Sequence, residues 1–177
     1  MRLAAPAKAS SAKTEQIILF RVSGQLFAVS SASVQEVRSV DSMSGAATEI
    51  AAPGIRKVRH VVRRGDRSLF IVNGAMHFGL HAAEGALLFV LRKTRTALLI
   101  DGIDKMAAMT RLQALPLSFC HEERQWYRGL TALDQTVVPV VNPEGFLSPE
   151  ELALLDAALL KEDNSAAAAL EETGLAQ

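Results

Sequence analysis

A succession of short apolar runs separated by turn residues is the feature that most limits the folds open to this chain. Residues 16–22 form one such run, and the dipeptide Ser23-Gly24 separates it from a second run at residues 25–29. Gly24 gives the backbone the freedom that a two-residue hairpin turn requires. The pattern recurs at residues 69–73, 87–92, 96–101, 126–133 and 136–142, with two further turns at residues 93–95 and 134–135. The sequence therefore predicts at least seven strands and an all-β fold.

Several of these runs are apolar on both faces, as in the segment Leu87-Leu88-Phe89-Val90. Successive side chains of a strand point to opposite faces, so such a strand must be covered from two sides. A pair of barrels or a sandwich provides this cover. Pro139 has no N–H to donate to a ladder, which predicts an edge strand or a bulge at that position.

Two helices are predicted between and after the strands. Residues 31–37 form a short candidate, and Ser148-Pro149-Glu150-Glu151 has the cap serine, first-turn proline and glutamate of a helix start. Leu152, Leu155 and Leu159 follow at helical spacing, so a C-terminal helix is expected over residues 149–161. The arm at residues 1–14 and the acidic, alanine-rich tail at residues 162–177 are expected to be flexible, or at most a frayed helix at the alanines.

Charge and cysteine content exclude several broad classes. The 177 residues include 19 Lys and Arg and 19 Asp and Glu, so the chain has no net charge to attract nucleic acid or an anionic membrane. Cys120 is the single cysteine, which prevents an intrachain disulfide and favours a reducing compartment. Neither a secretion signal nor an apolar run long enough to span a membrane is recognisable, so the expected location is the cytoplasm.

Candidates for chemistry are weak. Cys120-His121-Glu122 places a thiol next to an imidazole, but neighbouring side chains on a strand point apart, and a partly buried cysteine with a surface histidine is favoured. His77 and His81 have the spacing of a zinc helix, but Gly79 lies between them and a loop with solvated histidines is favoured. No catalytic residue, metal or cofactor is expected.

The densest local charge is a basic cluster at residues 56–67. It contains Arg56, Lys57, Arg59, Arg63, Arg64 and Arg67. Aromatic residues for base stacking are absent from this segment, so nucleic acid is a remote alternative. A docking surface for an acidic protein and a solvated hairpin that keeps a sheet edge soluble both remain open.

The order of these segments resembles the CheW family over residues 15–148. The first hairpin at residues 16–29, the segment Val34-Gln35-Glu36-Val37-Arg38, and the Ile50-Ala51-Ala52-Pro53 segment follow the family's order. So do Arg64-Gly65 of the second hairpin, the strand at residues 97–103, and the closing strand at residues 137–147.

The resemblance implies two packed SH3-like five-stranded barrels, at approximately residues 15–82 and 83–148. It also implies a scaffold without catalytic residues that contacts the regulatory domain of a CheA-type histidine kinase and the cytoplasmic tip of a chemoreceptor. The partner-binding residues carried over are Val34, Glu36, Arg64 and Gly65. Val34 would be an apolar anchor, and Glu36 and Arg64 a charged register; alternatively, Glu36 and Arg64 bridge each other and hold the fold.

The first half departs from the family pattern. Arg59 stands where the family has a glycine, and the strand at residues 70–74 is displaced by one residue relative to Arg64-Gly65. These departures leave open a related pathway, such as one that controls pili or development. Remote alternatives from other classes are a nucleic-acid-binding arginine hairpin and a small enzyme that uses Cys120.

Overall fold

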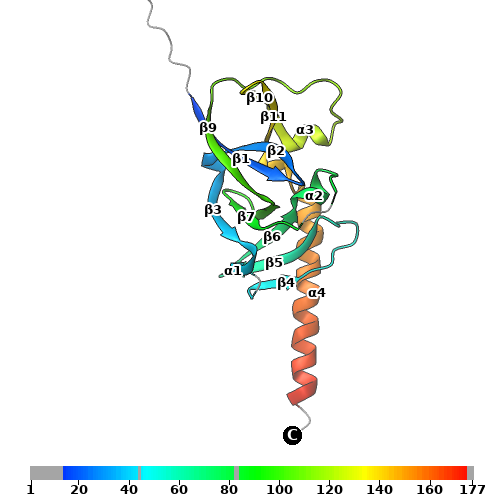
Figure 1. The fold of residues 1–177 in the computed structure, drawn as a ribbon. Coiled ribbons are helices and arrows are strands. Elements are labelled where there is room, and N and C mark those ends of the chain that lie inside the picture. Colours follow the sequence, from blue (N-terminus) through cyan, green and yellow to red (C-terminus); the bar gives the residue numbers. More distant parts are fainter. Residues whose placement is uncertain (1–13, 44, 82–83, 175–177) are drawn as a thin grey trace, which may run out of the picture.

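The structure, a computed structural model, describes residues 14–43, 45–81 and 84–174, and it is built from two β-sheets (Figure 1). One sheet has five strands in the order β10-β11-β2-β1-β9, and the other has six in the order β3-β7-β8-β6-β5-β4. The predicted all-β fold is confirmed. The second sheet has one strand more than the five expected for a barrel.

The five-stranded sheet combines strands from the beginning and the end of the β-region. Its strands are β1 (Glu15–Val22), β2 (Gln25–Ser30), β9 (Gly102–Met109), β10 (Tyr127–Leu133) and β11 (Thr136–Val141). Ser23 and Gly24 both have positive φ angles, of 49° and 76°, which is the conformation that a type I′ hairpin turn requires. The first predicted hairpin is thus confirmed, with β1 and β2 paired antiparallel from Ile17 opposite Ser30 to Val22 opposite Gln25.

The six-stranded sheet contains the middle of the chain. Its strands are β3 (Val34–Ser39), β4 (Ala47–Glu49), β5 (Val58–Arg64), β6 (Arg67–Asn73), β7 (Leu87–Leu91) and β8 (Thr96–Ile100). Strands β7 and β8 follow residue 83 but pair with β3 and β6. The six-stranded sheet therefore contains strands from both sides of the expected barrel boundary between residues 82 and 83.

Two local predictions are wrong. The short helix expected at residues 31–37 is a 3-10 turn at Ser31–Ser33 followed directly by β3, because the β-branched Val34 and the following residues pair with β7. Strand β11, which contains Pro139, is not an edge strand, since it lies between β10 and β2. The strand is not bulged at Pro139 either, since Pro139 pairs with Leu130 and the irregularity in that ladder lies between Tyr127 and Gly129. Its register with β2 is a single position, Val140 opposite Ala28, so Pro139 occupies no ladder position facing that strand.

The main core lies between the two sheets. Alternate residues of β1 divide between two clusters: Ile18, Phe20 and Val22 join the main core, whereas Ile17 and Leu19 pack on the opposite face of the same sheet. Strand β7 behaves likewise, with Phe89 in the main core and Leu88 in a third cluster. The expectation that these strands are covered from both sides is confirmed.

Four helices complete the described fold: α1 (Val40–Met43), α2 (Gly74–His77), α3 (Glu123–Trp126) and α4 (Pro149–Gly174). The predicted start of α4 is confirmed. The Ser148 hydroxyl accepts a hydrogen bond of 3.1 Å from the Glu151 N–H, and a Glu151 carboxylate oxygen accepts one of 2.9 Å from the Ser148 N–H. This reciprocal pair is a capping box.

Helix α4 extends beyond the expected end at Lys161 and continues to Gly174, away from the sheets (Figure 1). The segment from residue 162 to residue 174 is therefore helical, which corrects the expected flexible tail and agrees with the alternative of a helix at the alanines. Leu155 and Leu159 are buried in the main core, as their spacing predicts. Alanine has the highest helix propensity of all residues, which explains why the helix continues through residues 166–169. The expected N-terminal arm lies outside the described residues except for Thr14, as do residues 175–177.

Candidate partner-binding surface

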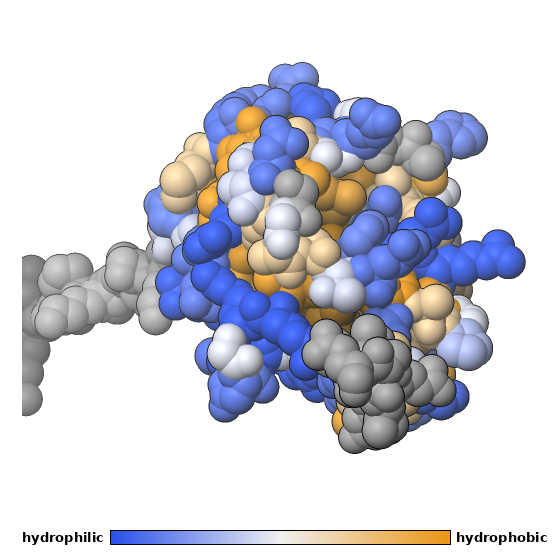
Figure 2. Space-filling view, turned by 90° about the horizontal axis from the view of Figure 1, so that it is seen from below, coloured by the Kyte–Doolittle hydropathy of each residue, from blue (hydrophilic) through white to orange (hydrophobic). Residues whose placement is uncertain are grey.

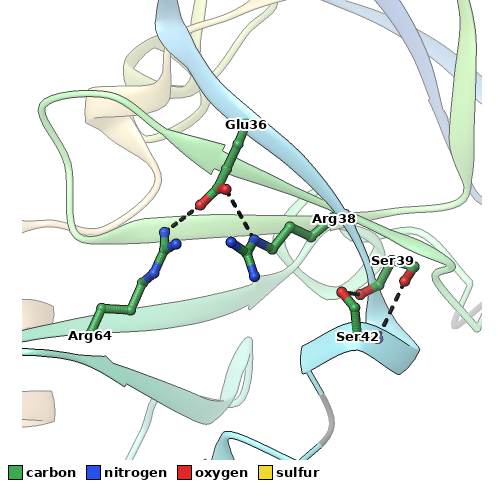
Figure 3. A network of polar contacts seen from close by, with 5 residues as sticks. All are labelled: Glu36, Arg38, Ser39, Ser42 and Arg64. Atoms are coloured by element: carbon green, nitrogen blue, oxygen red, sulfur yellow. Dashed lines mark hydrogen bonds and ion pairs between the residues drawn. The ribbon is translucent and has the colours of Figure 1, made fainter.

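A network of three charged side chains connects β3 to the end of β5. One Glu36 carboxylate oxygen accepts a hydrogen bond from Arg64 Nη1, and the other accepts one of 3.0 Å from Arg38 Nε (Figure 3). Strand β3 supplies Glu36 and Arg38, and β5 ends at Arg64. The structure therefore brings together two of the expected site residues, and it adds Arg38, which the sequence did not indicate as a site residue.

The network remains accessible from solvent. The side chains of Glu36 and Arg64 are 28% and 39% exposed. Partial burial alone would raise the pKa of the Glu36 carboxyl, but the hydrogen bonds from Arg64 and Arg38 outweigh it, so the pKa lies below its usual range. Glu36 thus carries a charge at neutral pH, and a partly exposed ion network of this kind contributes little to stability.

Gly65 sets the position of Arg64. It has a φ of +62° and begins the two-residue turn between β5 and β6, where Arg64 pairs with Arg67. A residue with a side chain is strained in that conformation, whereas glycine is not. The role of Gly65 is therefore to shape the turn that presents Arg64.

Val34 does not fit the predicted role of an exposed apolar anchor. It is 7% exposed and belongs to the main core. In a regular strand Val34 and Glu36 would share a face, but the ladder between β3 and β7 has a bulge between them. The bulge lets Val34 point into the core while Glu36 faces the network.

Some residues of the basic cluster pair with α4, and one pairs with Glu36. Lys57 Nζ lies 2.8 Å from Glu151, and Arg63 pairs with Asp163, so both cations hold α4. Arg64 joins the network with Glu36, whereas Arg56, Arg59 and Arg67 are exposed. Part of the cluster thus anchors the acidic helix that follows the β-region, an interaction invisible in the local sequence.

The exposure of Cys120 and the burial of His77 both differ from the predictions. Cys120 is exposed rather than partly buried, because it lies in the loop just before α3, where its N–H donates a 3.0 Å hydrogen bond to Glu123. His121 and His81 are exposed as expected. His77, however, is 3% exposed, at the end of α2.

His77 is packed among aromatic rings. Its ring centroid lies 4.5 Å from that of Trp126 and 5.0 Å from that of Phe146. Neither ring nitrogen has a hydrogen-bond partner among the described residues. Burial, and secondarily the positive charge of Lys57, lowers the pKa of His77 to about 3, so the ring is neutral at physiological pH.

A cavity of about 370 Å³ opens between α1 and the six-stranded sheet. Val40, Met43, Ile71, Leu88 and Leu99 give it an apolar lining, with Glu49 and His60 also lining it. Viewed from the side toward which α4 extends, the molecule shows an apolar area bordered by hydrophilic residues (Figure 2).

Residues 14–43, 45–81 and 84–174 contain no cluster of three or more His, Cys, Asp or Glu side chains suited to a metal ion. In the same ranges, no helix combines the length and the apolar character needed to cross a membrane.

The fold and the surface together define a class: a two-sheet β-protein with a partly exposed network of ions that connects two strands of one sheet. A family model described as CheW-like domain matches residues 16–151. The chain belongs to the CheW-like family.

A solved structure agrees with this assignment at the level of the fold. The scaffolding protein TtCheW from Thermoanaerobacter tengcongensis superposes with a TM-score of 0.63 at 10% sequence identity, covering 78% of this chain and 95% of that one. No curated protein matches the chain.

Proposed function

We propose that this chain is a non-enzymatic cytoplasmic adaptor that couples a CheA-type histidine kinase to chemoreceptors and is recruited to receptor arrays at the membrane. The observation that carries the proposal is the match of the CheW-like family model to residues 16–151, which include both sheets. The partners would be the regulatory domain of the kinase and the cytoplasmic tip of the receptor.

The network of Glu36, Arg38 and Arg64 supports a contact role. Its members are partly exposed, and they come from strands distant in sequence, so their relative position depends on the fold. A partner that presents complementary charge can exchange ion pairs with them, which sets specificity and association rate. Val34 would support this surface from the core rather than contact the partner, and Gly65 would shape the turn that carries Arg64.

A related pathway with a different partner is the second candidate. The departure at Arg59 coincides with a bulge between Val58 and His60 in the ladder of β5 and β6. This bulge places an exposed arginine beside the hairpin that carries Arg64. A partner with a more acidic surface than that of the usual family partner would exploit this difference.

Reversing one charge tests the contact surface. Arg64→Glu is expected to weaken binding of the kinase regulatory domain by roughly tenfold or more. The substitution replaces the cation that pairs with Glu36 by a second carboxylate, so two negative charges face each other on the contact surface. Calorimetric titration of the purified proteins measures the change. Arg59→Glu makes the same charge change on the same strand and is expected to alter the affinity less than about threefold if the usual partner binds.

Two results would count against this surface. If Arg64→Glu lowers the melting temperature while the folded protein binds with unchanged affinity, the ion network serves only the fold. If Arg59→Glu is the more damaging change, the hairpin contacts its partner through the bulge, and the second candidate is favoured.

A further inference from the structure

A small cavity lies between the β5–β6 turn and the β7–β8 turn, at one end of the six-stranded sheet. Its volume is about 240 Å³. Arg64 and Arg67 line it from one hairpin, and Thr94 and Arg95 from the turn of the other. Three arginines and a threonine thus line a space large enough for a small ion.

The positive charge around this cavity is only partly neutralised. Arg64 pairs with Glu36, and Arg95 makes two hydrogen bonds to Asp156, of 2.8 and 2.6 Å. Within the described residues, Arg67 has no acidic partner. One cation therefore remains in excess among the groups that line the cavity and their partners.

An unsatisfied polar atom lies at the same place. Thr94 Oγ1 is buried and has no hydrogen-bond partner in the part of the chain that the structure describes. A buried hydroxyl without a partner is unfavourable, so a ligand that accepts its hydrogen bond would relieve that cost. Because Oγ1 is shielded from solvent, the β7–β8 turn must shift slightly for the hydroxyl to donate to a ligand in the cavity.

We propose that this cavity is a binding site for an oxyanion, of the phosphate or carboxylate class. Arginine presents up to five N–H donors in a planar fork that fits both kinds of group. Arg67 would supply the unpaired charge, Thr94 a hydrogen bond, and Arg64 and Arg95 their remaining N–H groups. The site shares Arg64 with the proposed partner surface but does not depend on any partner.

Titration of the intact chain with inorganic phosphate, and separately with acetate, at constant ionic strength tests the site. Backbone amide shifts in the two turns are expected to change saturably with at least one of the two anions. Arg67→Gln and Thr94→Val are each expected to weaken that binding by about tenfold, since each removes a direct donor. Arg56→Gln removes the same charge outside the cavity, and we expect it to change the affinity less than twofold.

Each outcome decides a point. Binding of phosphate alone assigns the site to phosphate groups, and binding of acetate alone assigns it to carboxylates. Absence of saturable shifts with both anions overturns the proposal, as does an equal loss of affinity in Arg56→Gln. Thermal melting of each variant without anion verifies folding, and Thr94→Val is expected to fold because it removes an unpaired polar atom. No kinase or receptor enters the experiment, so its failure leaves the adaptor role untouched.

Discussion

Replacing Phe20 with alanine is expected to lower the free energy of unfolding by about 3–5 kcal/mol. Phe20 is fully buried between the two sheets. Its ring lies 5.8 Å from that of Phe27 in the same sheet and 5.3 Å from that of Phe89 in the other. The substitution leaves a cavity at the contact between the sheets, where neighbours from two rigid layers can relax only partly.

Chemical denaturation with linear extrapolation measures this loss. Because the whole domain has a stability of only about 5–15 kcal/mol, Phe20→Leu serves as a milder variant, with an expected loss of about 1–2 kcal/mol. Leu117→Ala is the control, since Leu117 is 96% exposed and its truncation is expected to change stability by less than about 0.5 kcal/mol. Equal effects of Phe20→Ala and Leu117→Ala would mean that the sheets do not pack through Phe20.

Acid is expected to destabilise the fold through His77. An unfolded histidine has a pKa near 6.5, whereas burial lowers the pKa of His77 to about 3 in the folded protein. The unfolded state therefore binds more protons between these values, and stability falls as the pH falls below about 6.5. Full stability is present above that pH, and at pH 5 linkage gives a loss of about 2 kcal/mol.

His77→Phe isolates this effect. The variant keeps an aromatic ring among Trp126 and Phe146 and removes two unpaired nitrogens, so it is expected to be at least as stable as the wild type at pH 8. Between pH 8 and pH 5 the free energy of unfolding of His77→Phe should fall by about 2 kcal/mol less than that of the wild type, as measured by urea unfolding at each pH. His121→Gln, at an exposed position, should follow the wild type. The account of His77 fails if wild type and His77→Phe lose the same stability over this range.

The hairpins were predictable from sequence because their signals are local. Alternating apolar residues and two-residue turns fix β1 with β2 and β10 with β11, and both turns adopt positive φ angles. Strands β5 and β9 carry many charged or exposed residues, so their periodicity was hidden. Their pairing depends on β6 and β1, not on their own composition.

The end of α4 was not predictable from composition. Residues 162–174 look like a polar tail when read alone, yet Asp163 pairs with Arg63, which lies far away in sequence. His77 was mispredicted for a similar reason, because its burial comes from Trp126 and Phe146, on segments that follow it by tens of residues. Long-range contacts of this kind leave no trace in a local pattern.

The candidate surface was predictable in part. The family resemblance indicated Glu36 and Arg64, and the structure brings them together across 28 positions of sequence. It did not indicate Arg38, and it gave Val34 an exposed role that the bulge in β3 prevents. A bulge has no reliable sequence signal here, since the segment lacks glycine and its two valines, three positions apart, favoured a short helix.

If this chain couples a kinase to a receptor, it brings the kinase to receptor-bearing membranes, and co-sedimentation measures this recruitment. Membranes that carry the chemoreceptor are mixed with the CheA-type kinase of the same cell, with and without the purified chain, and the sedimented kinase is quantified. We expect the chain to increase kinase recruitment by roughly tenfold and Arg64→Glu to remove most of this increase. Equal sedimentation of the kinase with and without the chain would contradict it.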